Sequence, residues 1–247
     1  PSVNRIPWSY RLYRLTWTGL DLLFPPTCGG CGTVGWRWCP DCQARVPRID
    51  KPFCETCGIP TRGIPVCENC KFSPPAYRKM RSWAVFDSPI QKGLHTMKYR
   101  RNIGFGEAIA MQMTEYVRSL GWPIDMLIPV PLGKKRLKER GYNQVGLVAR
   151  PLAYQLGLQY ATDALVKSRE TRSQVGLSVS QRSANVQDAY QADSQIVMGK
   201  SVLIMDDVAT TGSTISACTT ALLTAGAKDV YVLTIARALP HHGLDRV

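Results

Sequence analysis

The chain has 247 residues, 31 basic against 18 acidic side chains and a formal net charge of +13. Hydrophobic residues make up 45% and charged residues 20%, as is usual for a globular protein in water, and the length allows one ordinary domain plus a smaller module. No apolar run approaches the roughly 18 residues of a membrane span, which argues against membrane insertion. Arg11, Arg14 and Asp21 interrupt the apolar residues near the N-terminus, so we do not interpret that stretch as a signal peptide and expect a cytoplasmic protein.

Cysteine pairs dominate the first part of the chain. Eight of the nine cysteines form four C-x2-C pairs before residue 71, namely Cys28/Cys31, Cys39/Cys42, Cys54/Cys57 and Cys67/Cys70. Two intervening residues let a tight turn direct both thiolates at one ion, and two such pairs complete a tetrahedral zinc site without an open position. The pattern therefore predicts two structural zinc ions, held by sequential pairs as in two zinc ribbons. Crossed pairing is the alternative, and a disulfide scaffold is disfavoured in a reducing compartment.

From about residue 80 the pattern alternates between short apolar strands and helices. It predicts strands over 82–86, 125–131, 200–208 and 229–239, and helices over 89–99, 105–121, 143–157 and 213–227. Continuous apolar strands that alternate with helices indicate a mostly parallel sheet covered on both faces. Pro151 is expected to bend its helix, and Cys218 to be a small buried apolar residue. The polar segment 167–191 has few large apolar residues and is expected to be mobile.

The basic residues are concentrated in the middle of the chain. Residues 81–150 contain 12 basic and 5 acidic side chains, whereas residues 151–247 have eight of each. The excess before residue 81 is largely cancelled, because each Zn(Cys)4 centre carries about −2. A basic surface attracts phosphates, nucleic acid or anionic lipid. Trp83, Tyr99 and Phe105 lie in this segment and are compatible with base stacking, although aromatic residues are more often in the core.

The sequence VLIMDDVATTGST, residues 202–214, places two carboxylates at the end of an apolar strand and a small, hydroxyl-rich loop after them. In open α/β sheets, ligands bind beyond the carboxyl ends of the strands. The loop and the N-terminus of the next helix supply N–H and hydroxyl donors for a phosphate. Asp206 and Asp207 then need a ligand that donates hydrogen bonds, as a ribose diol does, with Mg2+ helping to neutralise the site. The pattern predicts a site for a ribose that carries a 5′-phosphate.

This string resembles the phosphoribosyl diphosphate (PRPP) signature of type I phosphoribosyltransferases. Together with the cysteine pairs, IPVPLGKKRLKERGYNQ (128–144) and RSQVGLS (172–178), it resembles the ComF family, including GntX-like proteins, over roughly residues 20–240. The resemblance implies an α/β type I phosphoribosyltransferase fold, a mostly parallel open sheet flanked by helices, with a small N-terminal double zinc-ribbon module. We divide the chain accordingly into a helical extension (1–24), a double zinc ribbon (25–75) and a phosphoribosyltransferase-like domain (76–247).

The same resemblance assigns site residues. It implies that Asp206 and Asp207 bind the ribose hydroxyls and that the 5′-phosphate binds the loop formed by Ala209, Thr210, Thr211, Gly212, Ser213 and Thr214. It places the pyrophosphate near Leu132 and Gly133, with the R-x3-R-G-[FY]-N-Q residues Arg136, Arg140, Asn143 and Gln144 facing the same cleft; an exposed basic turn is the alternative. The catalytic set is the two aspartates with Arg169 and Arg182, which fall in the segment that corresponds to the family's lid; a solvated loop with incidental arginines is the alternative. His95 is expected to be an ordinary surface or packing residue.

Two functions are compatible with these residues. The ComF resemblance implies a PRPP-binding protein that handles incoming single-stranded DNA in natural transformation or DNA utilisation. The alternative is an active phosphoribosyltransferase that transfers the 5-phosphoribosyl group of PRPP to an unidentified base or amine and releases pyrophosphate. Candidate partners are single-stranded DNA, a DNA-import helicase or recombination proteins, and a second copy of the chain. The expected metal ions are two structural Zn2+ and a Mg2+ that accompanies PRPP.

Overall fold

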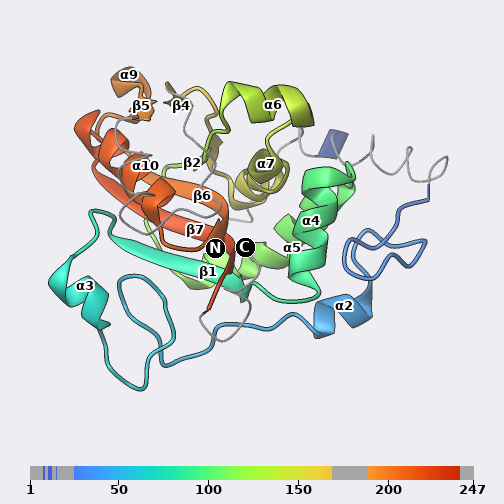
Figure 1. Ribbon diagram of the computed structural model, residues 1–247. Helices are drawn as coiled ribbons and strands as arrows, with labels where there is room; N and C mark the ends of the chain where they lie inside the picture. Colours follow the sequence, from blue (N-terminus) through green and yellow to red (C-terminus); the bar gives the residue numbers. More distant parts are fainter. Residues whose placement is uncertain (1–7, 9–10, 13–14, 16–24, 169–188, 240–247) are drawn as a thin grey trace.

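The computed structural model describes residues 25–168 and 189–239, together with residues 8, 11, 12 and 15 near the N-terminus (Figure 1). Most of the expected helical extension over 1–24 lies outside the described residues. The same is true of 169–188, which is most of the segment expected to be mobile and which contains Arg169 and Arg182.

Five parallel strands form the central sheet, in the order β1-β7-β6-β2-β3. Their bounds are Lys79–Val85 for β1, Asp229–Arg237 for β7, Ser201–Ala209 for β6, Met126–Pro129 for β2 and Gln159–Tyr160 for β3. A separate antiparallel pair consists of β4, Leu165–Lys167, and β5, Tyr190–Ala192. Strand β6 pairs with β7 on one side and β2 on the other. Its first five residues are buried, because a strand between two layers has no solvent-exposed face.

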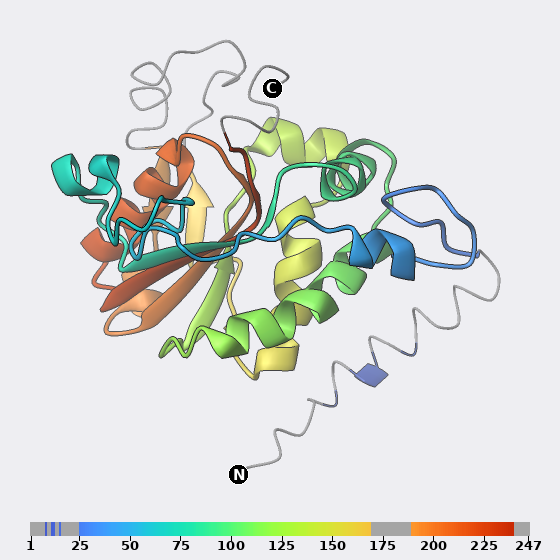
Figure 2. The same ribbon diagram turned by 90° about the horizontal axis from the view of Figure 1, so that it is seen from below.

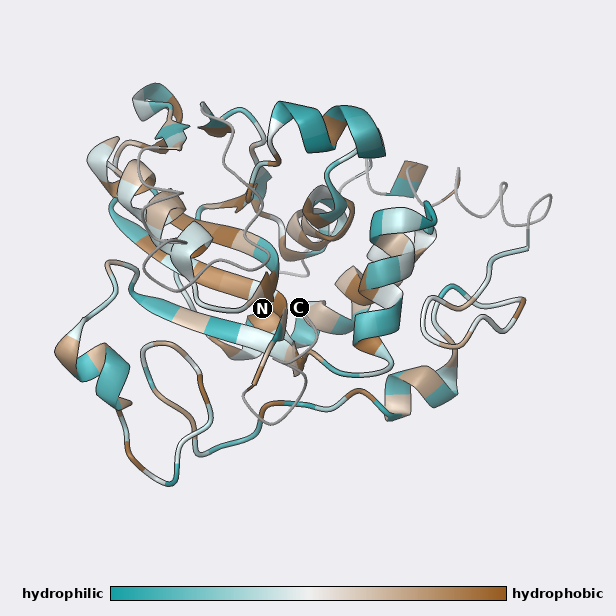
Figure 3. Ribbon diagram, in the orientation of Figure 1, coloured by the Kyte–Doolittle hydropathy of each residue, from teal (hydrophilic) through white to brown (hydrophobic). Residues whose placement is uncertain are grey.

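Helices cover both faces of this sheet (Figures 1 and 2). Helices α4 (Ile90–Tyr99), α5 (Gly104–Ser119) and α7 (Gln144–Leu156) share one apolar cluster with the sheet, and α10 (Ser213–Thr224) shares a second. The remaining helices are short: α2 Pro40–Ala44, α3 Glu68–Phe72, α6 Lys134–Arg140 and α9 Ser194–Val197. Figure 3 shows hydrophobic strands between the layers and a largely hydrophilic α6. None of the described helices is long and apolar enough to cross a bilayer.

The predicted strands and helices of the α/β part are all present, with shifted ends. Strand β1 begins three residues before the predicted 82–86, because its first residues pair with β7 rather than follow an apolar run. Pro151 lies inside α7. Strands β3, β4 and β5 were not predicted, since two or three residues carry no readable periodicity. Trp83, Phe105 and Cys218 are core residues.

The first group of cysteines is built into the core of the α/β part. Cys42 and Trp38 belong to the same buried cluster as Phe105 of α5, and the Trp38 and Phe105 rings meet edge to face at 4.9 Å. Nearby, Arg37 Nη1 lies 2.5 Å from Glu107 Oε2. Gly29 is so close to Phe105 that an added Cβ would be 2.5 Å from a ring carbon. The first ribbon and α5 therefore pack as one unit, across the boundary expected near residue 75.

The second group of cysteines lies against the edge of the sheet. Met80 of β1 donates its N–H to the Thr56 carbonyl at 2.7 Å, and Arg81 reaches the Glu55 carbonyl at 3.1 Å. Arg237 of β7 donates to the Cys57 carbonyl at 2.6 Å. An edge strand has unpaired backbone groups that could pair with another chain. This ribbon covers part of the β1 edge while its cysteines form a small cluster of their own.

Candidate functional site

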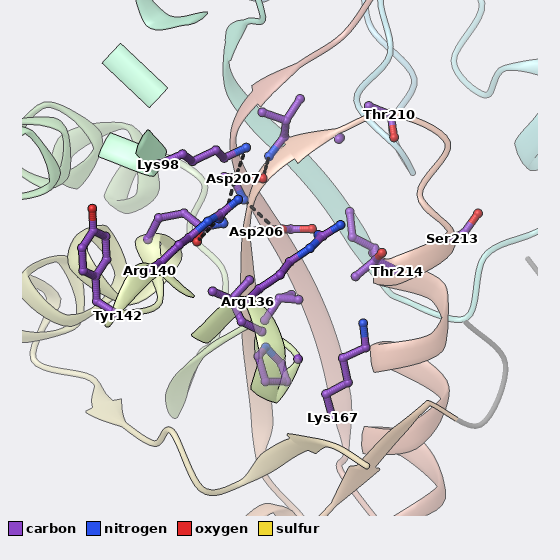
Figure 4. Close-up of a pocket in the computed structure, with 18 of the residues that line it drawn as sticks. Lys98, Arg136, Arg140, Tyr142, Lys167, Asp206, Asp207, Thr210, Ser213 and Thr214 are labelled. Atoms are coloured by element: carbon purple, nitrogen blue, oxygen red, sulfur yellow. Dashed lines mark hydrogen bonds and ion pairs between the residues drawn. The ribbon is translucent and has the colours of Figure 1, made fainter. Parts of the chain in front are cut away.

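A cavity of about 700 Å³ opens at the carboxyl ends of β6 and β2 (Figure 4). One wall is the end of β6 with the loop that leads into α10, and a second is the exit of β2 with α6. Lys98 at the end of α4 and Lys167 of β4 also line the cavity. Segments that are far apart in sequence converge here because parallel strands end at the same edge of a sheet.

The loop between β6 and α10 is shaped to approach an anion. Gly212 has a left-handed backbone (φ +79°), which glycine adopts without strain, and helix α10 begins directly after it. No side chain caps this helix, and the first N–H groups of a helix have no partner within it. The Thr211 and Ser213 hydroxyl oxygens are 3.0 Å apart. Backbone N–H groups, small hydroxyl side chains and the helix dipole together favour a phosphate-sized anion.

Asp206 and Asp207 end β6 beside this loop but have different surroundings. Asp207 is buried, and its Oδ2 accepts from Lys98 Nζ at 2.7 Å and from Gln144 Nε2 at 3.0 Å. Its Oδ1 accepts from the Val208 N–H at 2.7 Å. Asp206 Oδ1 accepts only the Asp207 N–H, at 2.8 Å, among the contacts of the described residues. Asp207 is therefore fixed in place, and Asp206 has acceptor capacity left for a ligand.

These surroundings separate the pKa values of the two carboxyl groups. Burial, followed by the neighbouring Asp207 charge, raises the pKa of Asp206 from 3.8 to about 7. Burial opposes the ionisation of Asp207 too, but Lys98 outweighs it with help from Gln144, and the pKa of Asp207 is lowered. At neutral pH the site thus holds one stable carboxylate and one carboxyl group near its titration midpoint.

We expect this raised pKa to be visible in the pH dependence of stability. The folded protein holds the Asp206 proton more tightly than the unfolded chain does. The group's contribution to the free energy of unfolding is therefore fully present below about pH 3.8 and is lost as the pH rises to about 7. Asp206→Asn removes that loss. Because one pKa unit corresponds to about 1.4 kcal/mol, the free energy of unfolding should rise by at least about 1 kcal/mol above pH 7.

Urea unfolding near pH 4 and above pH 7 measures this difference, in comparison with the exposed N-cap variant Asp193→Asn. An Asp206→Asn effect that is equal at both pH values would show that the pKa of Asp206 is not raised.

Helix α7 begins beside the aspartates and connects them to α6. Gln144 is buried, and while its Nε2 binds Asp207, its Oε1 accepts from Arg140 Nη1 at 2.7 Å. Asn143 instead caps the helix: its Oδ1 accepts from the Val145 N–H at 3.0 Å, and its Nδ2 donates to the Val130 carbonyl at 2.9 Å. Arg140, Gln144, Asp207 and Lys98 therefore form one chain of polar contacts.

Most residues that the sequence proposed for the site are in the cavity wall. The lining includes Leu132, Gly133, Arg136, Arg140, Gln144, Asp206, Asp207, Ala209, Thr210, Thr211, Gly212, Ser213 and Thr214. Figure 4 shows Arg136 and Arg140 pointing towards the aspartates. Asn143 is not part of the lining, because its side chain is used in the cap of α7.

Lys98 is the main residue of this site that the sequence did not reveal. It approaches Asp207 from α4, a helix distant in sequence from β6. The apolar residues Ile90, Leu94 and Met97 predict that this helix packs on the sheet, and the segment is rich in basic residues. Nothing in that pattern indicates which lysine meets an aspartate, because the contact depends on the tertiary packing of α4.

Each cysteine tetrad holds its sulfur atoms as one zinc ion requires. The tetrads are Cys28, Cys31, Cys39 and Cys42, and Cys54, Cys57, Cys67 and Cys70, with all Sγ atoms of a tetrad within 4.8 Å of one another. The Cys31–Cys39 and Cys57–Cys67 sulfur distances are 3.6 and 3.7 Å. A tetrahedron with Zn–S bonds of about 2.3 Å has edges of about 3.8 Å. All eight thiols are free, and the grouping is sequential rather than crossed or disulfide-bonded.

Known proteins resemble both parts of the chain. A family model described as a double zinc ribbon domain matches residues 19–71, and one described as a phosphoribosyl transferase domain matches residues 146–244. Competence protein F of Haemophilus influenzae is 27% identical over 209 residues, which cover 81% of this chain and 90% of that protein. DNA utilization protein YhgH of Shigella flexneri is 32% identical over 210 residues, or 83% and 92%. The chain belongs to the ComF family.

Membership of the ComF family agrees with the fold and with the tetrads. The expected type I phosphoribosyltransferase fold with an N-terminal zinc-ribbon module is confirmed, and the two tetrads fit structural zinc. Among solved structures, glutamine PRPP amidotransferase from B. subtilis, complexed with ADP and GMP, is 22% identical. It aligns with a TM-score of 0.36 over 57% of this chain and 26% of its own, and so distant a likeness bears on no functional question.

Proposed function

We propose that the protein binds PRPP in this cavity and handles single-stranded DNA in natural transformation or DNA utilisation. The observation that carries the first half is the convergence of two aspartates, a hydroxyl-rich turn and several cationic side chains around about 700 Å³. That volume lies within the range of small-molecule sites. PRPP combines a diol with two separated anionic groups, and the cavity offers acceptors for the diol between two regions suited to anions.

In this proposal each part of PRPP has its own partners. The ribose hydroxyls donate to Asp206 and Asp207, and the 5′-phosphate binds loop 209–214 at the N-terminus of α10. The pyrophosphate lies by Leu132 and Gly133, where Arg136 and Arg140 offer bidentate donors. A Mg2+ ion bound with PRPP would neutralise part of the pyrophosphate charge, and carboxylate and phosphate oxygens are the ligands it prefers. Arg169 and Arg182 are proposed to complete the site from the segment outside the described residues.

The DNA part of the proposal is supported by the relatives' names and by the charge of α6. The relatives are named a DNA utilization protein and a competence protein. On α6, Arg136 and Arg140 line the cavity, whereas Lys134 and Lys138 are exposed and are not among its lining residues. We propose that these lysines contact the DNA backbone and that a DNA-import helicase or recombination proteins are partners. A cytoplasmic location would keep the zinc-binding thiols reduced.

Paired substitutions on α6 should separate the two ligands. Lys134→Ala with Lys138→Ala is expected to weaken single-stranded DNA binding and to reduce its salt slope by about 1.4, at roughly 0.7 per lost phosphate contact, while PRPP affinity barely changes. Arg136→Ala with Arg140→Ala is expected to lower PRPP affinity and leave the salt slope unchanged. Fluorescence anisotropy over a salt series and calorimetry with PRPP and Mg2+ measure the two effects. If both double variants lose PRPP binding and neither changes the salt slope of DNA binding, all four of these side chains of α6 serve the cavity and none contacts DNA.

Turnover of PRPP is the second candidate function, and the pKa of Asp206 favours it. A carboxyl group with a pKa of about 7 in the cavity wall is suited to exchange a proton with an incoming nucleophile at neutral pH. Displacement at C1 of the ribose would join the acceptor to that carbon and release pyrophosphate. Incubation with PRPP, Mg2+ and a panel of nucleobases, amines and DNA tests this by pyrophosphate release. Release that depends on the acceptor and is lost in Asp206→Asn supports an enzyme, and PRPP binding without release supports a ligand-binding role.

A further inference from the structure

A second cavity, of about 710 Å³, lies between the first zinc ribbon and α4. Its lining shares Phe86, Lys98 and Tyr99 with the first cavity. Because the same three side chains form part of both walls, the two cavities adjoin at the end of α4. A ligand in the second cavity would therefore approach the aspartates past Lys98 and Tyr99.

The charge of the second cavity favours an anionic ligand on its α4 side. Lys92, Lys98 and Arg100 are in its lining, and no aspartate or glutamate is among the described residues that form it. Lys92 and Arg100 are exposed. With zinc bound, the tetrad that includes Cys28 and Cys31 would carry a charge of about −2 on the opposite wall, so an anion would lie towards the helix rather than the ribbon.

Tyr99 provides a flat apolar surface where the two cavities meet. The residue is 66% exposed, in contrast to Trp83 and Phe105, which are buried. The His95 ring lies 4.8 Å from its ring, and the Arg140 guanidinium lies 5.5 Å from its centroid. These two neighbours restrict the orientation of the Tyr99 ring, and its exposed surface can receive a planar group. Stacking of a base on an aromatic ring stabilises bound nucleic acid strands.

The ribbon forms the facing wall with backbone rather than with large side chains. Residues 29–32 contain three glycines. Gly29 and Gly30 turn towards the core, where an added Cβ would meet Phe105 or Trp38, and Gly32 has open space beside it, so no large side chain rises from this wall. Hydrogen bonds hold the wall to the α4 side: Asn102 Nδ2 donates to the Thr27 carbonyl at 3.1 Å, and Thr96 Oγ1 lies 3.5 Å from the Gly29 carbonyl. The second cavity, called the slot below, is thus formed by packed elements and not by one side chain.

We propose that this slot binds a nucleotide unit, with its base stacked on Tyr99 and its phosphate beside Lys92 and Arg100. The proposal extends the proposed function and rests on it in one respect, namely that PRPP occupies the first cavity. The slot would then hold the second ligand next to the ribose. The nucleotide could be free or part of a single strand, and the experiment distinguishes these sources.

Anisotropy with a labelled short oligothymidylate, and calorimetry with thymidine monophosphate, test the slot in the full chain. Tyr99→Ala is expected to weaken binding by about 5- to 150-fold, which corresponds to the energy of one base stacked on an aromatic ring, and Tyr99→Phe to restore it. Lys92→Ala with Arg100→Ala should also weaken binding, with PRPP affinity unchanged, since neither residue lines the first cavity. Lys200→Ala with Lys228→Ala is the matched control, because both are exposed lysines at the amino ends of β6 and β7.

The outcomes separate this proposal from the PRPP assignment. Parental nucleotide affinity in the Tyr99→Ala and Lys92/Arg100 variants would overturn the slot, even if PRPP binds. If these variants lose nucleotide affinity as expected but the parent protein does not bind PRPP, the result would support the slot and refute the PRPP site. Comparable binding of monophosphate and oligonucleotide supports a free nucleotide as the occupant, and binding of the oligonucleotide alone supports a strand.

Discussion

Loss of the first zinc site is expected to destabilise the whole described fold, whereas loss of the second should act mainly on the edge of the sheet. Cys42→Ser removes a ligand whose neighbours Trp38 and Phe105 belong to the main core cluster. Structural zinc contributes about 10–16 kcal/mol of apparent binding free energy in small zinc modules, as much as a typical domain's total stability of about 5–15 kcal/mol. Without the metal, the first ribbon is expected to unfold, and the apolar face of α5 that packs on it would become exposed to solvent.

Cys70→Ser affects a different region. Its tetrad forms a separate small cluster, and the ribbon accepts hydrogen bonds from β1 and β7 through the carbonyls of Glu55, Thr56 and Cys57. The midpoint of thermal unfolding should therefore fall less than in Cys42→Ser. Both variants should contain one zinc ion by elemental analysis, where the parent contains two.

Hydrogen exchange locates the two effects. In Cys42→Ser the amides of α5 should lose protection, and in Cys70→Ser the loss should be confined to residues 51–72 and β1. Cys218→Ser is the control, since this buried thiol lies in α10 outside both tetrads. The Cys218→Ser protein should keep two zinc ions. Equal destabilisation by the two tetrad variants, or intact α5 protection in Cys42→Ser, would show that the first ribbon is not part of the core.

Local patterns in the sequence predicted the parts of this structure that short-range chemistry determines. The C-x2-C spacing brings the two thiols of each pair together and favoured the sequential grouping that the structure shows, although it was also compatible with crossed pairing. Residues 202–214 combine the end of a strand, a turn and the start of a helix. The position of Asp206 and Asp207 at the carboxyl end of a strand was therefore predictable. The alternation of apolar segments likewise predicted the parallel sheet.

Contacts between distant segments were not predictable in this way. Lys98 meets Asp207 only because α4 packs on the sheet beside β6, and no spacing in either segment encodes that contact. Tyr99 could not be distinguished from Trp83 and Phe105 as the exposed member of the three. Asn143 belongs to a motif associated with the cleft, yet its side chain caps α7, since an asparagine at a helix start binds the backbone nearby.

Asp206→Asn with Asp207→Asn is expected to abolish measurable PRPP binding. Asparagine keeps the shape of the side chain but removes the charge, and each charged hydrogen bond contributes about 1.5–3 kcal/mol. Two lost bonds correspond to roughly 3–6 kcal/mol, or about a hundredfold to ten-thousandfold in affinity. Calorimetry with PRPP and Mg2+ above pH 7, where Asp206 is ionised, gives the largest contrast with the parent.

The single variants should differ, because the two carboxyl groups have different partners. Asp207→Asn also leaves Lys98 without its ion-pair partner, so it should lower stability as well as affinity. Asp206→Asn should lower affinity while raising stability above pH 7, and should flatten the pH dependence of PRPP binding around pH 7, leaving only the titration of the ligand's own phosphates. Asp193→Asn, an N-cap change outside the cavity, should bind like the parent. Unchanged PRPP affinity in a folded double variant would mean that the aspartates do not hold a ribose, and the cavity would then need another ligand.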